Sequence, residues 1–197
     1  MFRPRPHSGH PHLFSSAKTA APIPARHPAL REALVQASLD PAVRSILYVA
    51  SAPAGAAQVA EIDAVVVQHD GGRFHLDVVP ARRVRDLDHE GLVQIALREL
   101  GLQQLVVTAA DLKAEPRYSN CRLVWSQKNL PVPVPLRMRI LKALADEGPI
   151  ELGRLLETIR SDRDPSTAVM SLACSDLLEI DLASGPLGPS TMMRSRT

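Results

Sequence analysis

The chain has few aromatic residues, few cysteines and no apolar run long enough to cross a membrane. Aromatic side chains make up 3% of its 197 residues, so its core must be built mainly from Leu, Val, Ile and Ala. Its two cysteines, Cys121 and Cys174, lack the spacing of a zinc site or a disulfide framework. The apolar runs are of strand length, far below the roughly 20 residues of a membrane helix. We therefore expect a soluble, cytoplasmic protein.

The sequence also lacks the short motifs of common small-molecule enzymes. There is no glycine-rich loop that would cradle a phosphate, no nucleophile elbow and no zinc-ligand spacing. Hydrophobic residues nevertheless make up 45% of the chain and charged residues 22%, which is enough apolar surface for a packed core. A small-molecule substrate is therefore not expected.

The net charge of +2 is unevenly distributed. Residues 1–31 carry five Lys or Arg and no acid, whereas residues 32–128 carry ten against twelve acids and residues 129–197 carry eight against nine. Residues 1–28 are rich in Pro, His, Ser and Ala and lack the continuous apolar segment of a secretory signal. We expect them to form a disordered basic leader, with an organelle transit peptide as the alternative.

Residues 29–128 alternate between helical and strand-like patterns, as in a small α/β domain. The clearest signal is Asp70-Gly71 between two apolar runs, which predicts a β-hairpin because glycine supplies the positive φ that such turns need. Apolar spacing and β-branched runs indicate the other elements. The expected elements are a helix over 29–37, strands over 43–50, 61–68 and 73–79, a helix over 88–101 begun by Asp88, a buried strand over 102–108, and helical residues 111–127 interrupted at Pro116.

A proline-rich segment separates this domain from the rest of the chain. Three alternating prolines in residues 129–135 can extend neither a helix nor a central strand, so we place a linker there. Beyond it we expect helices over 136–146, 151–160 and 165–176, then a strand over 177–182 paired with 191–194. This is the outline of a winged helix-turn-helix domain, which we place at residues 136–197.

Three acidic residues of the first domain are candidates for a shared site. Glu32 lies on the first expected helix, Asp63 in the first hairpin strand and Asp77 in the second. If the hairpin brings Asp63 and Asp77 together and the helix adds Glu32, the carboxylates would suit Mg²⁺, with Mn²⁺ as a substitute. Such a metal activates water for phosphodiester hydrolysis. His75 shares a strand face with Asp77 and titrates near neutral pH, so it is a candidate base.

This order of residues resembles the PD-(D/E)XK nuclease core, and in particular the TnsA-type endonuclease subunit of heteromeric cut-and-paste transposases. In that family a helical Glu, a strand Asp, and a Glu or Gln two residues before a Lys form the active site. The resemblance covers residues 29–195 and places these roles on Glu32, Asp63 and Asp77. It implies a restriction-endonuclease-like mixed sheet flanked by helices, then a winged helix, in a Mg²⁺-dependent DNA endonuclease that works in a nucleoprotein assembly.

The lysine position of that family is occupied by Val79. Valine can contact neither the scissile phosphate nor the attacking water. Arg82 and Arg83 lie beyond Pro80, where we expect the chain to leave the sheet, and arginine is a poor proton acceptor because it stays charged. The sequence therefore leaves two possibilities open: a nuclease that uses His75 as its base, or a degenerate nuclease fold that binds DNA or a partner without cutting.

The three acids also have purely structural interpretations. On an amphipathic helix, Glu32 would be a solvated surface residue. The two strand acids need partners, because an unpaired buried charge is costly. The partners that the sequence offers are Arg73 for Asp63, and His75 or Arg82 for Asp77.

The expected winged helix has few of the residues that read DNA. A recognition helix normally presents Arg, Lys, Asn or Gln, and residues 165–176 offer mainly hydroxyl groups. A non-enzymatic adaptor that docks on DNA or on a protein is therefore the alternative function. The basic residues of the helix expected over 136–146 either contact DNA or lie on a solvated face. The candidate DNA-contacting residues are Arg137, Arg139, Lys142, Arg160, Arg163, Ser166, Thr167 and Arg194.

Overall fold

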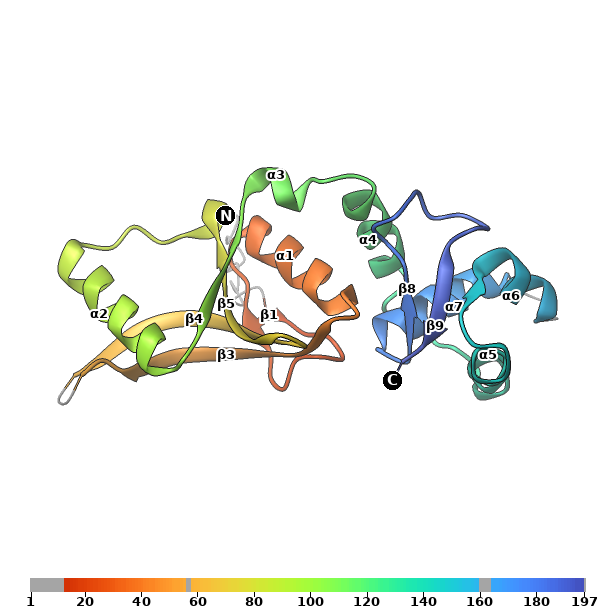
Figure 1. Cartoon of the computed structure of the whole chain (residues 1–197), viewed down its shortest axis with the longest axis horizontal. Coiled ribbons are helices and arrows are strands. Elements are labelled where there is room, and N and C mark those ends of the chain that lie inside the picture. Colours follow the sequence, from red (N-terminus) through yellow and green to blue (C-terminus); the bar gives the residue numbers. More distant parts are fainter. Residues whose placement is uncertain (1–12, 56–57, 160–163, 197) are drawn as a thin grey trace, which may run out of the picture.

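The computed structural model describes residues 13–55, 58–159 and 164–196, and it shows an elongated molecule made of two halves (Figure 1). One half holds a four-stranded sheet and the other a three-stranded sheet. The expected α/β class is confirmed, with a mixed sheet flanked by helices. Residues 1–12 of the expected leader lie outside the described residues.

Secondary structure begins earlier along the chain than the sequence predicts. Two short strands, β1 (Leu13–Phe14) and β2 (Ile23–Pro24), pair antiparallel ahead of the first helix. Phe14 is almost completely buried, and its ring stacks on Trp125 with the ring centroids 5.5 Å apart. Residues 13–28, which the sequence assigned to the leader, therefore contribute to the core.

The first half of the chain forms a mixed sheet covered by helices. Its elements are α1 (Pro28–Leu39), β3 (Val43–Pro53), β4 (Val59–His69), β5 (Gly72–Val78), the 3₁₀ turn η1 (Val79–Ala81), α2 (Leu87–Glu99), β6 (Gln103–Val107), α3 (Ala109–Leu112) and α4 (Arg117–Trp125). The strands lie in the order β3-β4-β5-β6, and the predicted hairpin joins β4 to β5. Only β5 and β6 are parallel, because the chain crosses between them through α2.

Separate apolar cores cover the two faces of this sheet. On the face covered by α1, here called the α1 face, Leu34 packs with Ile46, Val65, Val67, Leu76 and Val78. On the opposite face, the α2 face, Val93, Ala96 and Leu97 of α2 pack with Ile62 and Ala64. Because successive strand residues point to opposite faces, these two clusters also fix the direction of the polar side chains between them.

Helix α2 and strand β6 differ from the sequence prediction. The helix is capped by Asp86 rather than by Asp88, since the Asp86 carboxylate accepts a hydrogen bond from the His89 N–H at 2.7 Å. The expected buried strand is β6, but it is largely exposed. It lies at the edge of the sheet, whereas α2 packs against β3 and β4. The position of α2, and not a lack of apolar residues, leaves β6 exposed.

The second half contains three helices and an antiparallel sheet. Its elements are α5 (Val134–Glu147), β7 (Ile150–Glu151), α6 (Leu152–Thr158), α7 (Pro165–Cys174), β8 (Leu178–Ile180) and β9 (Met192–Ser195). The sequence predicts the helices and the β8–β9 pair, and the structure adds β7 in the order β7-β9-β8. Within the described residues, no helix combines the length and the apolar character needed to cross a bilayer.

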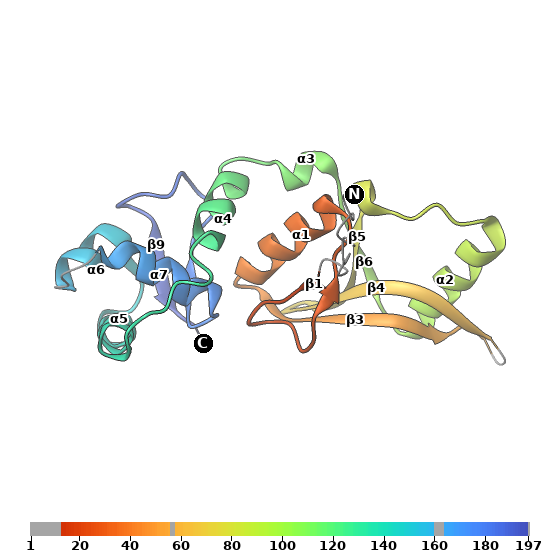
Figure 2. The same ribbon diagram turned by 180° about the vertical axis from the view of Figure 1, so that it is seen from behind.

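The two halves share one apolar core. Helix α7 packs against α4 and α1, and the view from behind shows α7 alongside α4 (Figure 2). Arg196 adds polar contacts: its guanidinium donates to the carbonyls of Pro41 at 2.5 Å and Val43 at 3.0 Å, and it lies 2.7 Å from a carboxylate oxygen of Glu179. These contacts hold the second half against the turn that follows α1.

Candidate functional site

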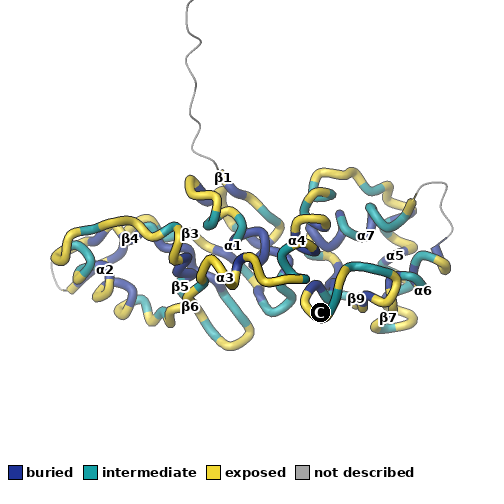
Figure 3. Tube along the Cα trace, turned by 90° about the horizontal axis from the view of Figure 1, so that it is seen from above, coloured by how far each residue is buried: buried dark blue, intermediate teal, exposed yellow. Residues whose placement is uncertain are grey.

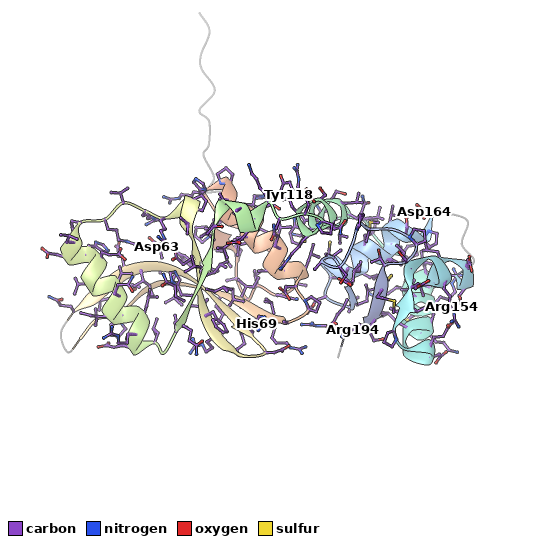
Figure 4. All side chains as sticks on the ribbon, turned by 45° about the horizontal axis from the view of Figure 1, so that its top comes forward. Asp63, His69, Tyr118, Arg154, Asp164 and Arg194 are labelled. Atoms are coloured by element: carbon purple, nitrogen blue, oxygen red, sulfur yellow. The ribbon has the colours of Figure 1, made fainter. Side chains whose placement is uncertain are left out.

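The predicted acids Asp63 and Asp77 both line a cavity of about 840 Å³ beside the first half of β4 and the last residues of β5. Its wall includes the start of α1, the segment between η1 and α2, and part of α2 itself. Asp63 lies in the half that holds the four-stranded sheet, whereas Arg154, Asp164 and Arg194 lie in the other half (Figure 4). The charged side chains of the cavity wall are Arg26, Asp63, Asp77, Arg82, Arg83, Arg85 and Glu90.

Asp63 lies in a β-bulge. The pairing of β3 with β4 shifts between Val49↔Ala64 and Ser51↔Glu61, so β4 has one residue more than β3 at this point. Asp63 takes up the irregularity with a φ of 46°, in the left-handed region that a non-glycine residue rarely adopts. Strain of this kind is often found at functional sites.

The Asp63 carboxylate accepts two short hydrogen bonds. Tyr48 donates its hydroxyl to Oδ1, and Arg83 donates from Nη1 to Oδ2. Burial of the phenol, together with the hydrogen bond to Asp63, raises the pKa of Tyr48 to about 12. The tyrosine therefore keeps its proton at neutral pH and acts as a donor to the carboxylate.

Asp77 has a different set of partners. Arg82 binds both of its oxygens, from Nε at 2.9 Å and from Nη2 at 2.5 Å, and Gln104 donates to Oδ2 at 2.6 Å. The hydrogen bond from Arg82 lowers the pKa of Asp77, and this effect exceeds the opposing effect of burial. Asp77 is therefore an ionised carboxylate held by an arginine.

Asp63 and Asp77 point to opposite faces of the sheet. Asp77 lies between Leu76 and Val78, which point to the α1 face, so its own side chain points to the α2 face. Asp63 lies between two residues of the α2 face and bonds to Tyr48, which packs on the α1-face core. Both carboxylates nevertheless line one cavity, beyond the last pair of the hairpin strands at Val66↔His75.

Glu32 lies apart from both acids. It is half-buried on α1, near Gln36 and Arg122, and is not among the residues that line the cavity. Its Oε1 is buried without a hydrogen-bond partner among the described residues, and burial raises the pKa of this carboxyl. The helix turns the residue toward α4, so the sequence interpretation of a solvated surface residue does not hold either.

His75 lines the cavity on the same face as Asp77, as the strand period predicts. Its Nδ1 atom is buried and has no hydrogen-bond partner among the described residues. Burial lowers the pKa of His75 more than the nearby Asp77 raises it. The imidazole is therefore neutral at pH 7.

The three predicted metal ligands are not gathered at one point. Asp63 and Asp77 each bind an arginine, and Glu32 lies outside the cavity. Among the described residues, no group of three His, Cys, Asp or Glu side chains is arranged to hold a metal ion.

The sequence named the right arginine for one acid and the wrong one for the other. Arg82 binds Asp77, as the sequence offered, whereas Asp63 is bound by Arg83 and not by the expected Arg73. Arg85 donates to the Ile62 carbonyl at 3.2 Å and so holds the same segment against β4. The contact of Arg83 was missed because it depends on the path of the chain after β5.

Several candidate DNA-contacting residues of the second half have partners within the chain. Ser166 and Thr167 donate their hydroxyls to Asp164 at the start of α7, and Arg194 pairs with the buried Glu179. These side chains therefore have structural partners. The basic residues Arg137, Arg139 and Lys142 lie along α5, and Arg160 and Arg163 are outside the described residues.

Helix α7 is covered by other parts of the chain. Its Ser171 hydroxyl donates to the Leu130 carbonyl at 2.8 Å, and the Cys174 thiol lies 3.3 Å from the Val124 carbonyl. Most of its residues are buried, and Ser166, Thr167 and Met170 are half-exposed. The surface that α7 offers to a DNA groove is therefore small.

The chain matches no protein-family model and no curated protein.

Proposed function

We propose that this chain is a nuclease-fold protein that binds DNA without cutting it, as a subunit of a nucleoprotein assembly. The observation that carries the proposal is the pairing of each cavity carboxylate with its own arginine, Asp77 with Arg82 and Asp63 with Arg83. In a metal-dependent nuclease such carboxylates would be metal ligands. Here each of them is neutralised by a side chain of the same chain.

The topology supports the nuclease-fold part of the proposal. The order α1-β3-β4-β5-α2-β6, with only the last two strands parallel, is compatible with the PD-(D/E)XK core that the sequence resembles. The order α5-β7-α6-α7-β8-β9 is compatible with a winged helix. Fold alone does not establish activity, so the proposal depends on the cavity.

Four arginines line the cavity, against three acids. A guanidinium carries five N–H donors, and the contact of Arg82 with Asp77 uses those on two of its nitrogens. Arg82 and Arg83 are each about half exposed, while the carboxylates that they bind are largely buried. The arginines can therefore keep these ion pairs and donate their remaining N–H groups to DNA phosphates. Binding of this kind does not depend on sequence and weakens steeply with salt.

The test combines a nicking assay with a binding assay. Purified protein is incubated with supercoiled DNA with and without Mn²⁺, and its affinity for a labelled duplex is measured across salt concentrations. We expect no nicking, and salt-dependent binding that falls in the variant R82A/R83A. The matched control is Arg154→Ala, which removes an exposed arginine paired with Glu147 at 2.8 Å in the other half. Metal-dependent nicking lost in D63A/D77A would overturn the proposal.

A second function, that of an adaptor without DNA affinity, is favoured by the covered face of α7. Because α7 is packed against α4 and Leu130, the second half has lost the surface with which a winged helix reads DNA. On this alternative the protein binds other proteins through its exposed faces. Absence of both nicking and duplex binding at low salt would favour the adaptor.

A further inference from the structure

Strands β4 and β5 separate at the end of the sheet where the candidate site lies. They pair only as far as Val66↔His75. Beyond this point β5 continues beside β6 to Val78, and the described residues place no strand next to residues 59–65 of β4 on the side away from β3. The cavity of about 840 Å³ lies in this space, which is here called the β4–β5 gap.

The segment that joins η1 to α2 crosses this gap. Its Arg82 binds Asp77 of β5. Its Arg83 binds Asp63 of β4. In Figure 1 the segment runs above β4 on its way to α2. The gap is therefore bridged by residues 82–86, which are held to the strands on both of its sides.

The inner wall of the gap is apolar. Ile62, Leu76 and Val93, from β4, β5 and α2, line the cavity and are almost completely buried. The bridging residues 82–86, in contrast, are largely exposed (Figure 3). A ligand that enters the gap therefore meets arginines near the surface and apolar side chains beneath them.

The open edge of β4 is not free to pair with another peptide strand. The Ile62 carbonyl accepts a hydrogen bond from Arg85 at 3.2 Å, and the Glu61 carbonyl lies 3.2 Å from Nε2 of His89. A strand added to a sheet edge depends on such backbone acceptors. Because side chains of the same chain already occupy these two, the gap is poorly suited to an extended peptide.

The unused hydrogen-bonding groups of the gap are donors with positive charge. A guanidinium has five N–H groups, and the ion pair of Arg83 with Asp63 uses one nitrogen. Arg26, on the wall of the cavity, makes no hydrogen bond or ion pair among the described residues. The remaining cavity acid, Glu90, lies 3.5 Å from Arg85. The unused donors therefore favour an anionic ligand.

We propose that the β4–β5 gap binds a single strand of DNA at an unpaired end, an inference that rests on the proposed function. The phosphates accept hydrogen bonds from the arginines, and the bases bury their apolar faces against the inner wall. A cavity of this volume encloses a ligand of small-molecule size, such as a nucleotide. A double helix, whose major groove alone is about 12 Å wide, reaches only the outward side of residues 82–86.

Fluorescence anisotropy at one low salt concentration tests the proposal. The labelled ligands are a duplex with an unpaired tail of about ten nucleotides, at the 5′ or the 3′ end, and a blunt duplex with the same number of phosphates. Wild type should bind at least one tailed duplex roughly tenfold more tightly than the blunt duplex. This ratio of affinities is called the tail preference.

Two neighbouring residues of α2 supply matched variants. Gln94 lines the gap, whereas Ile95 is 44% exposed and does not. Gln94→Glu and Ile95→Glu place the same charge on the same helix, so general repulsion of DNA is alike in both. Gln94→Glu should reduce the tail preference to about one, because the charge then faces the bound strand. Ile95→Glu should keep it.

Arg26→Ala gives a second, independent variant. The side chain is exposed and has no partner to lose, so the protein should stay folded, as circular dichroism will show. The tail preference should fall several-fold in Arg26→Ala. It should be unchanged in Arg154→Ala, which removes an arginine of the other half.

The outcomes separate this inference from the proposed function. Equal affinities for blunt and tailed duplexes would overturn the single-strand site and leave duplex binding in place. A tail preference that survives in both Gln94→Glu and Arg26→Ala would also overturn it, because the tail would then bind elsewhere. No binding of any duplex at low salt would overturn the proposed function, and this inference with it.

Discussion

Arg82 binds both carboxylate oxygens of Asp77, with Nε 2.9 Å from Oδ1 and Nη2 2.5 Å from Oδ2. The carboxylate is largely buried, while the arginine that binds it lies half in solvent. A buried acid held in this way depends on its ionised form. The ion pair between Asp77 and Arg82 therefore depends on pH.

Asp77→Asn should destabilise the protein by about 1 kcal/mol at neutral pH, because asparagine keeps the shape but loses the charge that Arg82 binds. The pKa of Asp77 is lowered in the folded state. Its contribution to the free energy of unfolding is therefore complete above the unfolded pKa of about 3.9 and is lost as the pH falls through the lower, folded pKa.

Urea unfolding at neutral pH and at about pH 3 measures this difference. The difference in unfolding free energy between wild type and variant should be smaller at about pH 3 than at neutral pH, because the stabilisation by the charge declines below the unfolded pKa and is lost through the lower, folded pKa. A gap that stays constant with pH would show that the charge of Asp77 contributes nothing.

The second prediction concerns the proton of Tyr48. Its pKa is about 12 in the folded protein, with burial as the first cause and the hydrogen bond to Asp63 as the second. Asp63→Asn removes the charge that favours the protonated phenol, so the pKa of Tyr48 should fall toward the usual value of about 10. Ultraviolet titration of tyrosinate in a Tyr118→Phe background isolates this group, because the chain has two tyrosines.

The third prediction uses two glycines with opposite surroundings. A Cβ on Gly153 would lie 3.1 Å from the Pro189 side chain and 3.2 Å from its carbonyl oxygen, whereas a Cβ on Gly91 of α2 meets nothing within 4 Å. Gly153→Ala should cost about 1–3 kcal/mol through overpacking. Gly91→Ala should add about 0.5–1 kcal/mol through helix propensity. Urea unfolding of both variants checks the opposite signs.

The fourth prediction tests how the halves are held together. Arg196→Ala removes the hydrogen bonds to the carbonyls of Pro41 and Val43 and should lower the free energy of unfolding by about 1–3 kcal/mol. Arg194→Ala is the control, since Arg194 shares the partner Glu179 but is mostly exposed. Thermal unfolding should show a clearly larger loss for Arg196→Ala. Equal losses would mean that the contact with Glu179 alone matters.

The sequence predicted most elements because their signals are local. The Asp70-Gly71 turn and the apolar period of α1 each depend on a few neighbouring residues, and both elements are present. The exposure of β6 was not predictable in this way. It depends on where α2 packs, and the apolar residues of β6 resemble those of a buried strand.

The candidate site was predicted less well because its geometry is set by irregular structure. The two-residue period of a strand assumes regular pairing, so it does not predict the bulge at Asp63. Likewise, Arg82 and Arg83 reach the two acids only because residues 82–86 fold back over the end of β5. The sequence supplied the acids and offered Arg82 for Asp77, but the path of the chain gave Asp63 the partner Arg83 in place of Arg73.

The covered face of α7 has a consequence for producing the protein in pieces. The prolines of residues 129–135 suggest a boundary at which the protein could be divided into two fragments. Helix α7, however, belongs to the same core as α1 and α4. A fragment that begins at Val134 would leave the apolar side of α7 in water, and a fragment that ends at Trp125 would expose the matching side of α4. We therefore expect neither piece to fold stably alone, and the whole chain is the unit to express and mutate.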